Sequence, residues 1–171
     1  MNQINIQYYK TKYAEFILGS YDSKLCLLDF RYRKMRTTVD DRLQKGLNAK
    51  FVEQDDEILK ETRKQLDEYF DMTRKEFTIP LITVGTDFQK SVWERLVKIP
   101  YGTTSSYLQL DKNIDNEKAV RAVANANGAN SIAIMIPCHR IIGTNGKLTG
   151  FGGGLPLKKR LLELEQNLFT S

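Results

Sequence analysis

The sequence predicts an α/β protein with two lobes, a sheet-rich lobe over residues 1–84 and a mostly helical lobe over residues 85–171. Residues 4–34 alternate β-branched and aromatic residues with polar ones, which is typical of strands. From Thr86 onward, short segments with helical spacing alternate with glycine-rich loops. The length of 171 residues, 41% of them hydrophobic and 27% charged, suffices for one large core or two small ones.

In the N-terminal lobe, the turn-forming stretch "GSYDSK" divides residues 4–34 into strands. Cys26 lies in the apolar run "LCLLDF" that follows, and we expect a buried core thiol there. Residues 55–72 have charges between apolar positions at helical spacing, which predicts an amphipathic helix lying on the sheet. Those apolar positions are Ile58, Leu59, Leu66, Tyr69 and Phe70. Residues 75–85 end the lobe as an extended segment.

The C-terminal lobe begins with a helix signal, in which Thr86 is the N-cap and Gln89 completes a capping box. The spacing places four apolar residues on one face of this helix: Phe88, Val92, Leu96 and Ile99. A turn, a short helix and a second turn follow over residues 99–116. An alanine-rich helix then has Asn116 as its cap and Gly128 as its end. Two short helices joined by a turn fit either a helix-turn-helix or a plain helical hairpin.

The end of the chain combines a loop and a helix. The stretch "GTNGKLTGFGGGLP" holds much of the chain's glycine and reads as a loop. The stretch "PLKKRLLELEQNLF" reads as a helix with Pro156 in its first turn.

The composition argues against several classes of protein. The N-terminal stretch lacks the apolar core of a secretory signal, and no run of about 18 apolar residues occurs, so we expect an intracellular, cytoplasmic protein that binds no membrane. Two distant cysteines and a single histidine do not supply a four-ligand structural zinc site. We expect no metal and two free thiols.

The net charge of +5 is unevenly distributed along the chain. Between Glu117 and Glu163 there is no acidic residue. A chance gap in the acids is one explanation, and a surface that meets phosphates is the other. The basic residues inside this window are Lys118, Arg121, Arg140, Lys147, Lys158, Lys159 and Arg160.

The stretch "IPCHRIIG" places Cys138 directly before the single histidine, His139. A free thiol has a pKa of about 8.5, so a nucleophilic cysteine needs a nearby base or positive charge, and His139 and Arg140 offer both. Neighbouring residues of an extended chain point to opposite sides, so a bend or a bridging water is required. The residues alone leave both a catalytic and a structural thiol open.

The same stretch closely resembles the active-site signature of the O6-alkylguanine-DNA alkyltransferases, also called methylated-DNA–protein-cysteine methyltransferases. The resemblance extends over "FQKSVWERLVKIPYGTTSSYLQL", "KAVRAVANANGAN" and "TGFGGGLPLKKRLLELE", and so over nearly all of residues 86–165. It implies a ribonuclease-H-like N-terminal lobe and a winged-helix-like, helix-turn-helix C-terminal lobe.

The resemblance also implies a single-turnover repair reaction that needs no cofactor. Cys138 takes the alkyl group from O6 of guanine in DNA and keeps it, with O4-alkylthymine as a candidate second substrate. His139 deprotonates the thiol through a water, Glu165 orients the imidazole, and Asn130 holds the turn around the active-site segment.

Other residues match positions in the family that handle DNA. Arg121 matches the side chain that fills the gap left by the flipped nucleotide, and Ala119 and Ala122 beside it are small enough for the helix to approach a minor groove. Ala126, one turn further along, is small as well and belongs to the same expectation. Tyr107 matches a tyrosine that hydrogen-bonds the substrate base. The substrate pocket would be lined by Tyr107, Ile141, Phe151, Gly152 and Lys158.

The resemblance has departures and rivals. Many relatives carry Tyr-Ser or Tyr-Ala where this chain has Phe151 and Gly152, so a side-chain hydrogen bond is lost at that point. A lesion-binding alkyltransferase-like protein that transfers nothing is one rival, but those proteins replace the cysteine. A Cys-His hydrolase is the other, and it would turn over repeatedly. We expect a monomer that binds double-stranded DNA.

Overall fold

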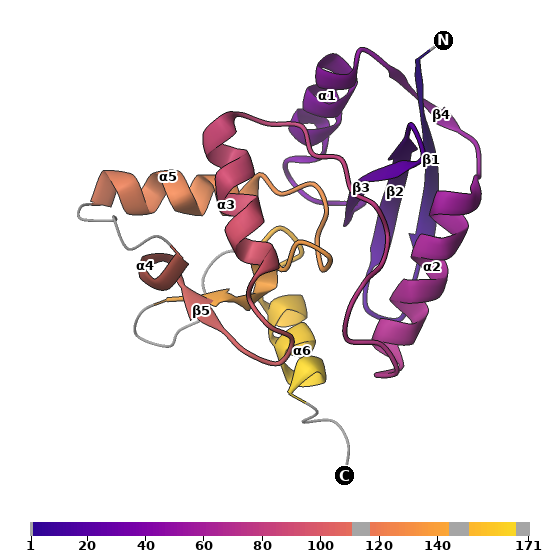
Figure 1. The fold of residues 1–171 in the computed structure, drawn as a ribbon. Coiled ribbons are helices and arrows are strands. Elements are labelled where there is room, and N and C mark those ends of the chain that lie inside the picture. The colour runs from indigo at the N-terminus through magenta and orange to yellow at the C-terminus, as the bar shows by residue number, and fades with distance from the viewer. Residues whose placement is uncertain (1, 111–116, 144–150, 167–171) are drawn as a thin grey trace. The chain divides into compact units, whose positions relative to one another are not determined.

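The computed structural model describes residues 2–110, 117–143 and 151–166, and the chain forms two compact units, Met1–Gly85 and Thr86–Ser171 (Figure 1). The first unit contains β1 (Gln3–Lys10), β2 (Glu15–Tyr21), β3 (Lys24–Phe30), α1 (Arg36–Leu47), β4 (Lys50–Glu53) and α2 (Glu57–Phe70). The second contains α3 (Asp87–Val97), β5 (Ser105–Ser106), α4 (Tyr107–Leu110), α5 (Glu117–Gly128), the 3₁₀ turn η1 (Cys138–Arg140), β6 (Ile141–Ile142) and α6 (Leu155–Glu165). A sheet-based unit followed by a helical unit confirms the predicted fold class.

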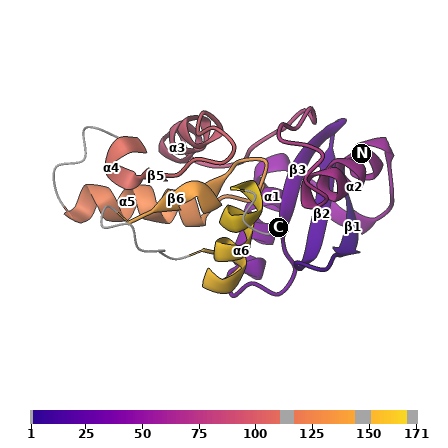
Figure 2. The same cartoon turned by 90° about the horizontal axis from the view of Figure 1, so that it is seen from below.

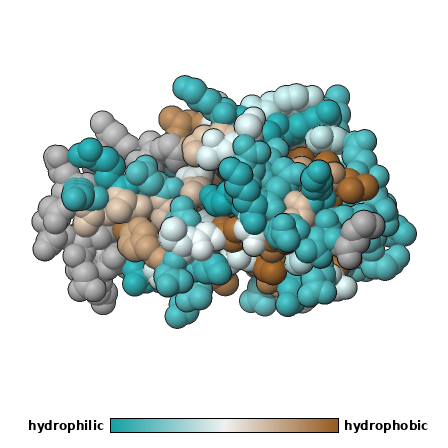
Figure 3. Space-filling model, turned by 90° about the horizontal axis from the view of Figure 1, so that it is seen from above, coloured by the Kyte–Doolittle hydropathy of each residue, from teal (hydrophilic) through white to brown (hydrophobic). Residues whose placement is uncertain are grey.

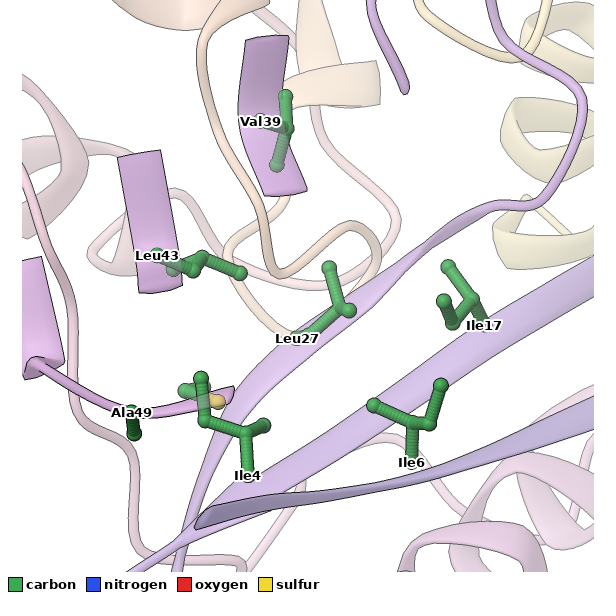
Figure 4. Packing of buried hydrophobic residues seen from close by; sticks show 8 residues of the cluster. Ile4, Ile6, Ile17, Leu27, Val39, Leu43 and Ala49 are labelled. Carbon is green, nitrogen blue, oxygen red and sulfur yellow. The ribbon is translucent and has the colours of Figure 1, made fainter. Parts of the chain in front are cut away.

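The first unit is built on a four-stranded sheet in the order β3-β2-β1-β4. The pairs β1–β2 and β2–β3 are antiparallel, and β4 runs parallel to β1. Helices α1 and α2 pack against the sheet from opposite sides (Figure 1). Figure 4 shows the α1 side, where buried side chains of the strands point toward the helix. This cluster comprises Ile4, Ile6, Ile17, Cys26, Leu27, Val39, Leu43 and Ala49.

The turn predicted within "GSYDSK" is confirmed. Asp22 and Ser23 join β2 to β3 and both have left-handed backbone angles, with φ of 51° and 59°. Two successive left-handed residues match the right-handed twist of the paired strands, which is why such turns dominate two-residue hairpins. The predicted amphipathic helix is also present as α2, with Leu59 and Leu66 fully buried.

In the second unit, α3 packs against α4 and α5, and β5 pairs in parallel with β6 (Figure 2). The capping box is confirmed, because Thr86 and Gln89 each accept a backbone N–H from the other. The expected apolar face is wrong at one position. Val92 and Leu96 are fully buried, whereas Phe88 is 43% exposed. Spacing sets the direction of a side chain, but tertiary packing decides whether the first helical turn is covered.

Hydrophilic residues predominate on the face seen in Figure 3, with apolar residues scattered among them. The most exposed large apolar side chains of α3 and α5 are Phe88, Val97 and Val120. Within the described ranges, no helix is both long enough and apolar enough to cross a membrane.

Candidate active site around Cys138

The segment between α5 and β6 is buried at every residue from Ala129 to Ile141. Asn130 fixes its path from within. The Nδ2–H group of Asn130 donates to the carbonyl oxygens of Ile132 and Ile136 at 3.3 and 2.8 Å, and Oδ1 accepts the N–H of Ile132 at 2.9 Å. A side chain that satisfies three buried backbone groups holds the segment in one conformation. The structure therefore gives Asn130 the turn-holding position that the resemblance implied.

A strained backbone residue also indicates that this segment is held in one conformation. Ile134 has a φ of 71°, in the left-handed region that β-branched residues rarely adopt. Such a conformation costs about 1–3 kcal/mol and persists only where the surroundings enforce it. The segment leading to Cys138 is thus positioned by contacts that outweigh a local preference.

Cys138 and His139 lie in a single 3₁₀ turn, η1, rather than in an extended chain. The turn is fixed at its start by the N–H of Cys138, which donates to the carbonyl of Ile136 at 2.7 Å, and at its end by the N–H of Arg140, which donates to Pro137 at 3.0 Å. Of the two alternatives that the sequence left open, a bend and a bridging water, the structure shows the bend.

His139 pairs with Glu165, the last residue of α6. Nε2 of His139 lies 2.7 Å from Oε2 of Glu165, and both side chains are fully buried. Glu163 lies two residues earlier and instead faces Lys159, with its carboxylate 3.9 Å from the ammonium group. The helix period therefore turns the two glutamates toward different partners.

Arg140 was not predicted as a partner of Glu165, yet it makes the larger number of contacts. Its Nε and one terminal nitrogen donate to the two carboxylate oxygens at 2.8 and 3.0 Å, and the other terminal nitrogen donates to the carbonyl of Ile99 at 2.7 Å. The ring centroid of Tyr101 lies 5.7 Å from the guanidinium carbon. The sequence signal was the position of Arg140 directly after the histidine, but nothing local indicates a partner 25 residues away.

The backbone beside Tyr101 approaches the same carboxylate. Gly102 has a φ of +80°, and its N–H points to Oε1 of Glu165 at 3.5 Å. A Cβ at this position would lie 3.2 Å from the carbonyl oxygen of Glu165, so glycine is required both for the backbone angle and for the close approach.

The protonation states follow from these contacts. Burial opposes ionisation of Glu165, but the hydrogen bonds from His139 and Arg140 outweigh it and lower the pKa of that carboxyl to about 2. Burial lowers the pKa of His139, and the positive charges of Arg140 and Lys158 lower it further, against the opposing effect of Glu165. A neutral His139 must donate its proton from Nε2 to Glu165, which leaves a lone pair on Nδ1. That buried Nδ1 accepts no hydrogen bond from the described residues.

Two residues assigned to the substrate pocket are fully buried close to this turn. Ile141 follows η1 directly, and Lys158 lies in α6, which packs against η1. Burial lowers the pKa of Lys158, while its electrostatic interaction with Cys138 acts in the opposite direction. A buried ammonium group facing a thiol favours the thiolate form of that thiol.

The residues assigned to DNA and base recognition lie on other elements of the unit. Arg121 and Ala122 are exposed on α5, where Ala119 is half-buried. Tyr107 begins α4, and Phe151 and Gly152 precede α6; all three are half-buried. The expectation for Ala126 was wrong, because it is 2% exposed and its carbonyl accepts the indole N–H of Trp93 at 2.8 Å.

The window between Glu117 and Glu163, which contains no acidic residue and is called the acid-free window below, does not form one basic surface. Arg140 and Lys158 are buried, which removes them from any surface that meets phosphates. The exposed members are Lys118, Arg121, Lys159 and Arg160, and Lys147 and the cap Asn116 lie outside the described residues. In the described part of the chain, no three His, Cys, Asp or Glu side chains are placed to hold a metal ion.

Comparison with known proteins matches both units to one family. Residues 4–83 match the model of the 6-O-methylguanine DNA methyltransferase, ribonuclease-like domain, and residues 87–167 match that of the DNA-binding domain. The chain is 52% identical over 112 residues to a methylated-DNA–protein-cysteine methyltransferase of Methanosarcina acetivorans, covering 66% of this chain and 72% of the relative. It is 43% identical over 123 residues to the inducible enzyme of Bacillus subtilis, covering 72% and 69%.

Solved structures agree along most of the chain. The structure of Mycobacterium tuberculosis OGT in complex with DNA has a TM-score of 0.78 and 37% identity, and the match covers 95% of this chain and 93% of that one. The O6-methylguanine methyltransferase of the same organism has a TM-score of 0.76 and 36% identity, covering 96% and 94%.

Proposed function

The chain belongs to the 6-O-methylguanine DNA methyltransferase family, and we propose that Cys138 is the residue that receives the alkyl group. The protein repairs DNA by transferring a methyl group from the DNA to a cysteine of its own chain. One observation supports the choice of cysteine: Cys138 shares a 3₁₀ turn with a buried imidazole–carboxylate pair, whereas Cys26 lies among apolar side chains.

The first step is removal of the thiol proton. His139 is neutral and carries its free lone pair on Nδ1, because Nε2–H is engaged by Glu165. A water molecule bridging the thiol and Nδ1 would carry the proton from sulfur to the imidazole, which satisfies the geometry of adjacent residues. Glu165 then stabilises the imidazolium, and Lys158 stabilises the thiolate.

The second step is displacement at the alkyl carbon. A bond forms between Sγ of Cys138 and that carbon while the bond from the carbon to O6 of guanine breaks. The electron pair of the broken bond goes to the guanine, which takes up one proton and becomes unmodified guanine. The hydroxyl of Tyr107 is the proposed donor to the base. The thioether on Cys138 has no route back to a thiol, so each chain reacts once.

The proposed partner is double-stranded DNA that contains O6-alkylguanine, approached by α5 from the minor groove. Arg121 is exposed on that helix beside Ala122, so a long cation stands next to a residue small enough for close approach. Flipping a nucleotide costs a few kcal/mol, and a side chain that occupies the vacated space offsets part of this cost. The protein acts as a monomer in this proposal.

Stoichiometry tests the reaction. A duplex with a radiolabelled methyl group on O6 of guanine, offered in excess, should label the protein to one methyl per chain and then stop. A thiol hydrolase would instead release its product repeatedly and retain no label. Continued release of methyl from the DNA without labelled protein would contradict the proposal.

Comparison of two substrates tests the role of Arg121. For Arg121→Ala, transfer from a duplex should fall by roughly a hundredfold, since each 1.4 kcal/mol of lost flipping support is about tenfold. Transfer from free O6-benzylguanine, which needs no flipping, should change little. Arg121→Lys, assayed at the same salt concentration, retains the charge and shows how much of the effect is phosphate neutralisation. Equal losses on both substrates would remove the assignment.

A further inference from the structure

The buried cluster of His139, Arg140 and Glu165, at the C-terminal end of α6, contains a cation, Arg140, that the two-step scheme does not use. Arg140 is 6% exposed and contacts both oxygens of Glu165, one of which also accepts the proton of His139. We propose that Arg140 keeps His139 neutral, and therefore able to accept the thiol proton, by compensating the charge of Glu165. Arg140 is on this view a positioning residue, and the inference rests on the proposed function of Cys138.

The argument begins with the charge balance of the cluster. Arg140 and Glu165 carry opposite charges, so the pair is neutral before His139 is counted. Without Arg140, a buried carboxylate would lie 2.7 Å from an imidazole and would lack the positive charge that the guanidinium supplies to both of its oxygens. An opposite charge at that distance favours the charged form of a titrating group by about 1–3 pKa units. His139 would then be an imidazolium, which cannot accept a proton.

The geometry selects arginine for this role. Nε and one terminal nitrogen bind the two carboxylate oxygens side by side, which fixes the plane of the carboxylate as well as its charge. The remaining terminal nitrogen donates to the carbonyl of Ile99, so the guanidinium cannot turn away. A lysine would bring one point charge and could not hold both oxygens in the plane.

Other charged and titratable groups face the pair from neighbouring elements. Lys158 on α6 acts on His139 in the same direction as Arg140, and it also interacts with Cys138. Tyr101 lies against the guanidinium and interacts electrostatically with both Glu165 and Arg140. The contacts that place a positive charge directly on the carboxylate, at 2.8 and 3.0 Å, are those of Arg140.

The chain offers a direct readout because His139 is its single histidine. Nitrogen-15 NMR of the imidazole therefore reports one residue, and it distinguishes the two neutral tautomers from the imidazolium. In the unmodified protein, His139 should be neutral with its proton on Nε2 and should titrate below its ordinary value. In Arg140→Gln the titration midpoint should rise by about 1–3 pH units. Arg160→Gln removes the same charge from an exposed position of α6 and should leave the midpoint unchanged.

A double variant separates this electrostatic role from a structural one. The double variant Arg140→Gln/Glu165→Gln removes both charges. The titration midpoint of His139 should therefore return to low pH, below the midpoint of Arg140→Gln alone. Arg140→Lys retains the charge and should raise the titration midpoint of His139 less than Arg140→Gln does. The lysine variant also provides the test if the glutamine variant does not fold. An unchanged midpoint in both single Arg140 variants, or a double variant no different from Arg140→Gln, would overturn the proposal.

Transfer assays keep this outcome distinct from the proposed function. If Arg140 controls the protonation of His139, Arg140→Gln should lose transfer near neutral pH and regain much of it at higher pH, where the imidazole loses its proton. Loss at every pH would indicate damage to the fold and contradict the proposal. If the unmodified protein placed no methyl group on Cys138, the proposed function would fail while the NMR result on His139 would still stand.

Discussion

The two cysteines of this chain are both buried, but they lie in very different surroundings. Cys26 is 0% exposed in β3 and belongs to the cluster of aliphatic side chains between the sheet and α1. Burial raises the pKa of its thiol to about 12. Cys138 is 6% exposed, yet it shares a 3₁₀ turn with His139 and Arg140, which both bind the carboxylate of Glu165, and it interacts electrostatically with the ammonium group of Lys158.

The difference indicates that the charges around a buried thiol, rather than its exposure, decide how easily that thiol ionises. Removing a thiol from water disfavours the thiolate wherever the surroundings are apolar. Where the surroundings are polar and their hydrogen bonds are satisfied, the same removal from water strengthens the interaction of the thiolate with fixed charges nearby. The second unit stabilises such a site with the hydrogen bonds of Asn130 and the ion pair of Arg140 and Glu165, whereas the cluster of buried side chains around Cys26 is apolar.

The largest expected effect comes from replacing each thiol in turn. Cys138→Ala should abolish methyl transfer from DNA yet retain binding to duplex DNA, because Arg121 and α5 are untouched. Cys26→Ala should retain transfer, since that thiol is packed in the core and inert. Both are checked by a labelled-methyl assay together with a binding titration on the same preparation. Methyl transfer that survives in Cys138→Ala would contradict the assignment of Cys138 as the acceptor.

A second effect separates the buried glutamate of α6 from its partly exposed neighbour. Glu165→Gln should slow transfer by roughly a hundredfold or more, since general-base catalysis contributes about 10²–10⁴-fold. Glu163→Gln serves as the matched control and should leave the single-turnover rate unchanged, because Glu163 faces Lys159. Similar losses of transfer rate in the two variants would show that the substitutions act by perturbing α6 and would contradict a specific role of Glu165.

The third comparison concerns stability in the two units. Leu43→Ala leaves a cavity in the core beneath α1 and should lower the free energy of unfolding by about 2–5 kcal/mol. Asn130→Ala leaves three backbone groups without their partner, at about 1–3 kcal/mol for each unsatisfied buried group. Urea unfolding gives both values. Asn130→Ala should also reduce transfer from the folded protein, whereas Leu43→Ala should not, and equal activity in the two variants would contradict the assigned role of Asn130.

The smallest effect is the dependence on pH. His139 must be unprotonated to act as a base, and burial lowers its pKa from the ordinary 6.5. The transfer rate should therefore be constant between pH 8 and 6.5 and fall about tenfold per unit only as the pH drops through the lowered value. A decline centred above pH 6.5 would contradict a neutral His139.

Folding stability should change with pH in the same direction. Since the folded chain protonates His139 less readily than the unfolded chain does, the stability from this group is present above pH 6.5 and is lost as the pH falls through the folded value. Glu165 behaves likewise between its ordinary pKa of 4.5 and about 2. Unfolding by urea at a series of pH values measures both.

Local signals in the sequence predicted local structure. The capping box of Thr86, the hairpin turn at Asp22 and Ser23, and Pro156 in the first turn of α6 depend on residues within four positions of each other, and all are present. Helix α1 was not predicted, because its N-terminus has no side-chain cap and it buries only Val39 and Leu43.

Long-range contacts were not predictable from the residues alone. The resemblance, rather than spacing, identified Glu165 as the partner of His139, and the pairing of Arg140 with the same carboxylate joins residues 25 positions apart. Burial of Arg140 and Lys158 contradicted the idea that the acid-free window is one basic surface. A sequence window records charges in order, while the fold decides which of them reach water.

The most direct test of the account asks which thiol carries the methyl group. The unmodified protein would be incubated with one equivalent of duplex DNA containing O6-methylguanine, digested, and analysed by peptide mass spectrometry. One methyl group should appear on the peptide that contains Cys138, and the peptide that contains Cys26 should be unmodified. Methylation of Cys26, or loss of the methyl group from the DNA with neither peptide modified, would contradict the claim that the polar surroundings of Cys138 make it the acceptor.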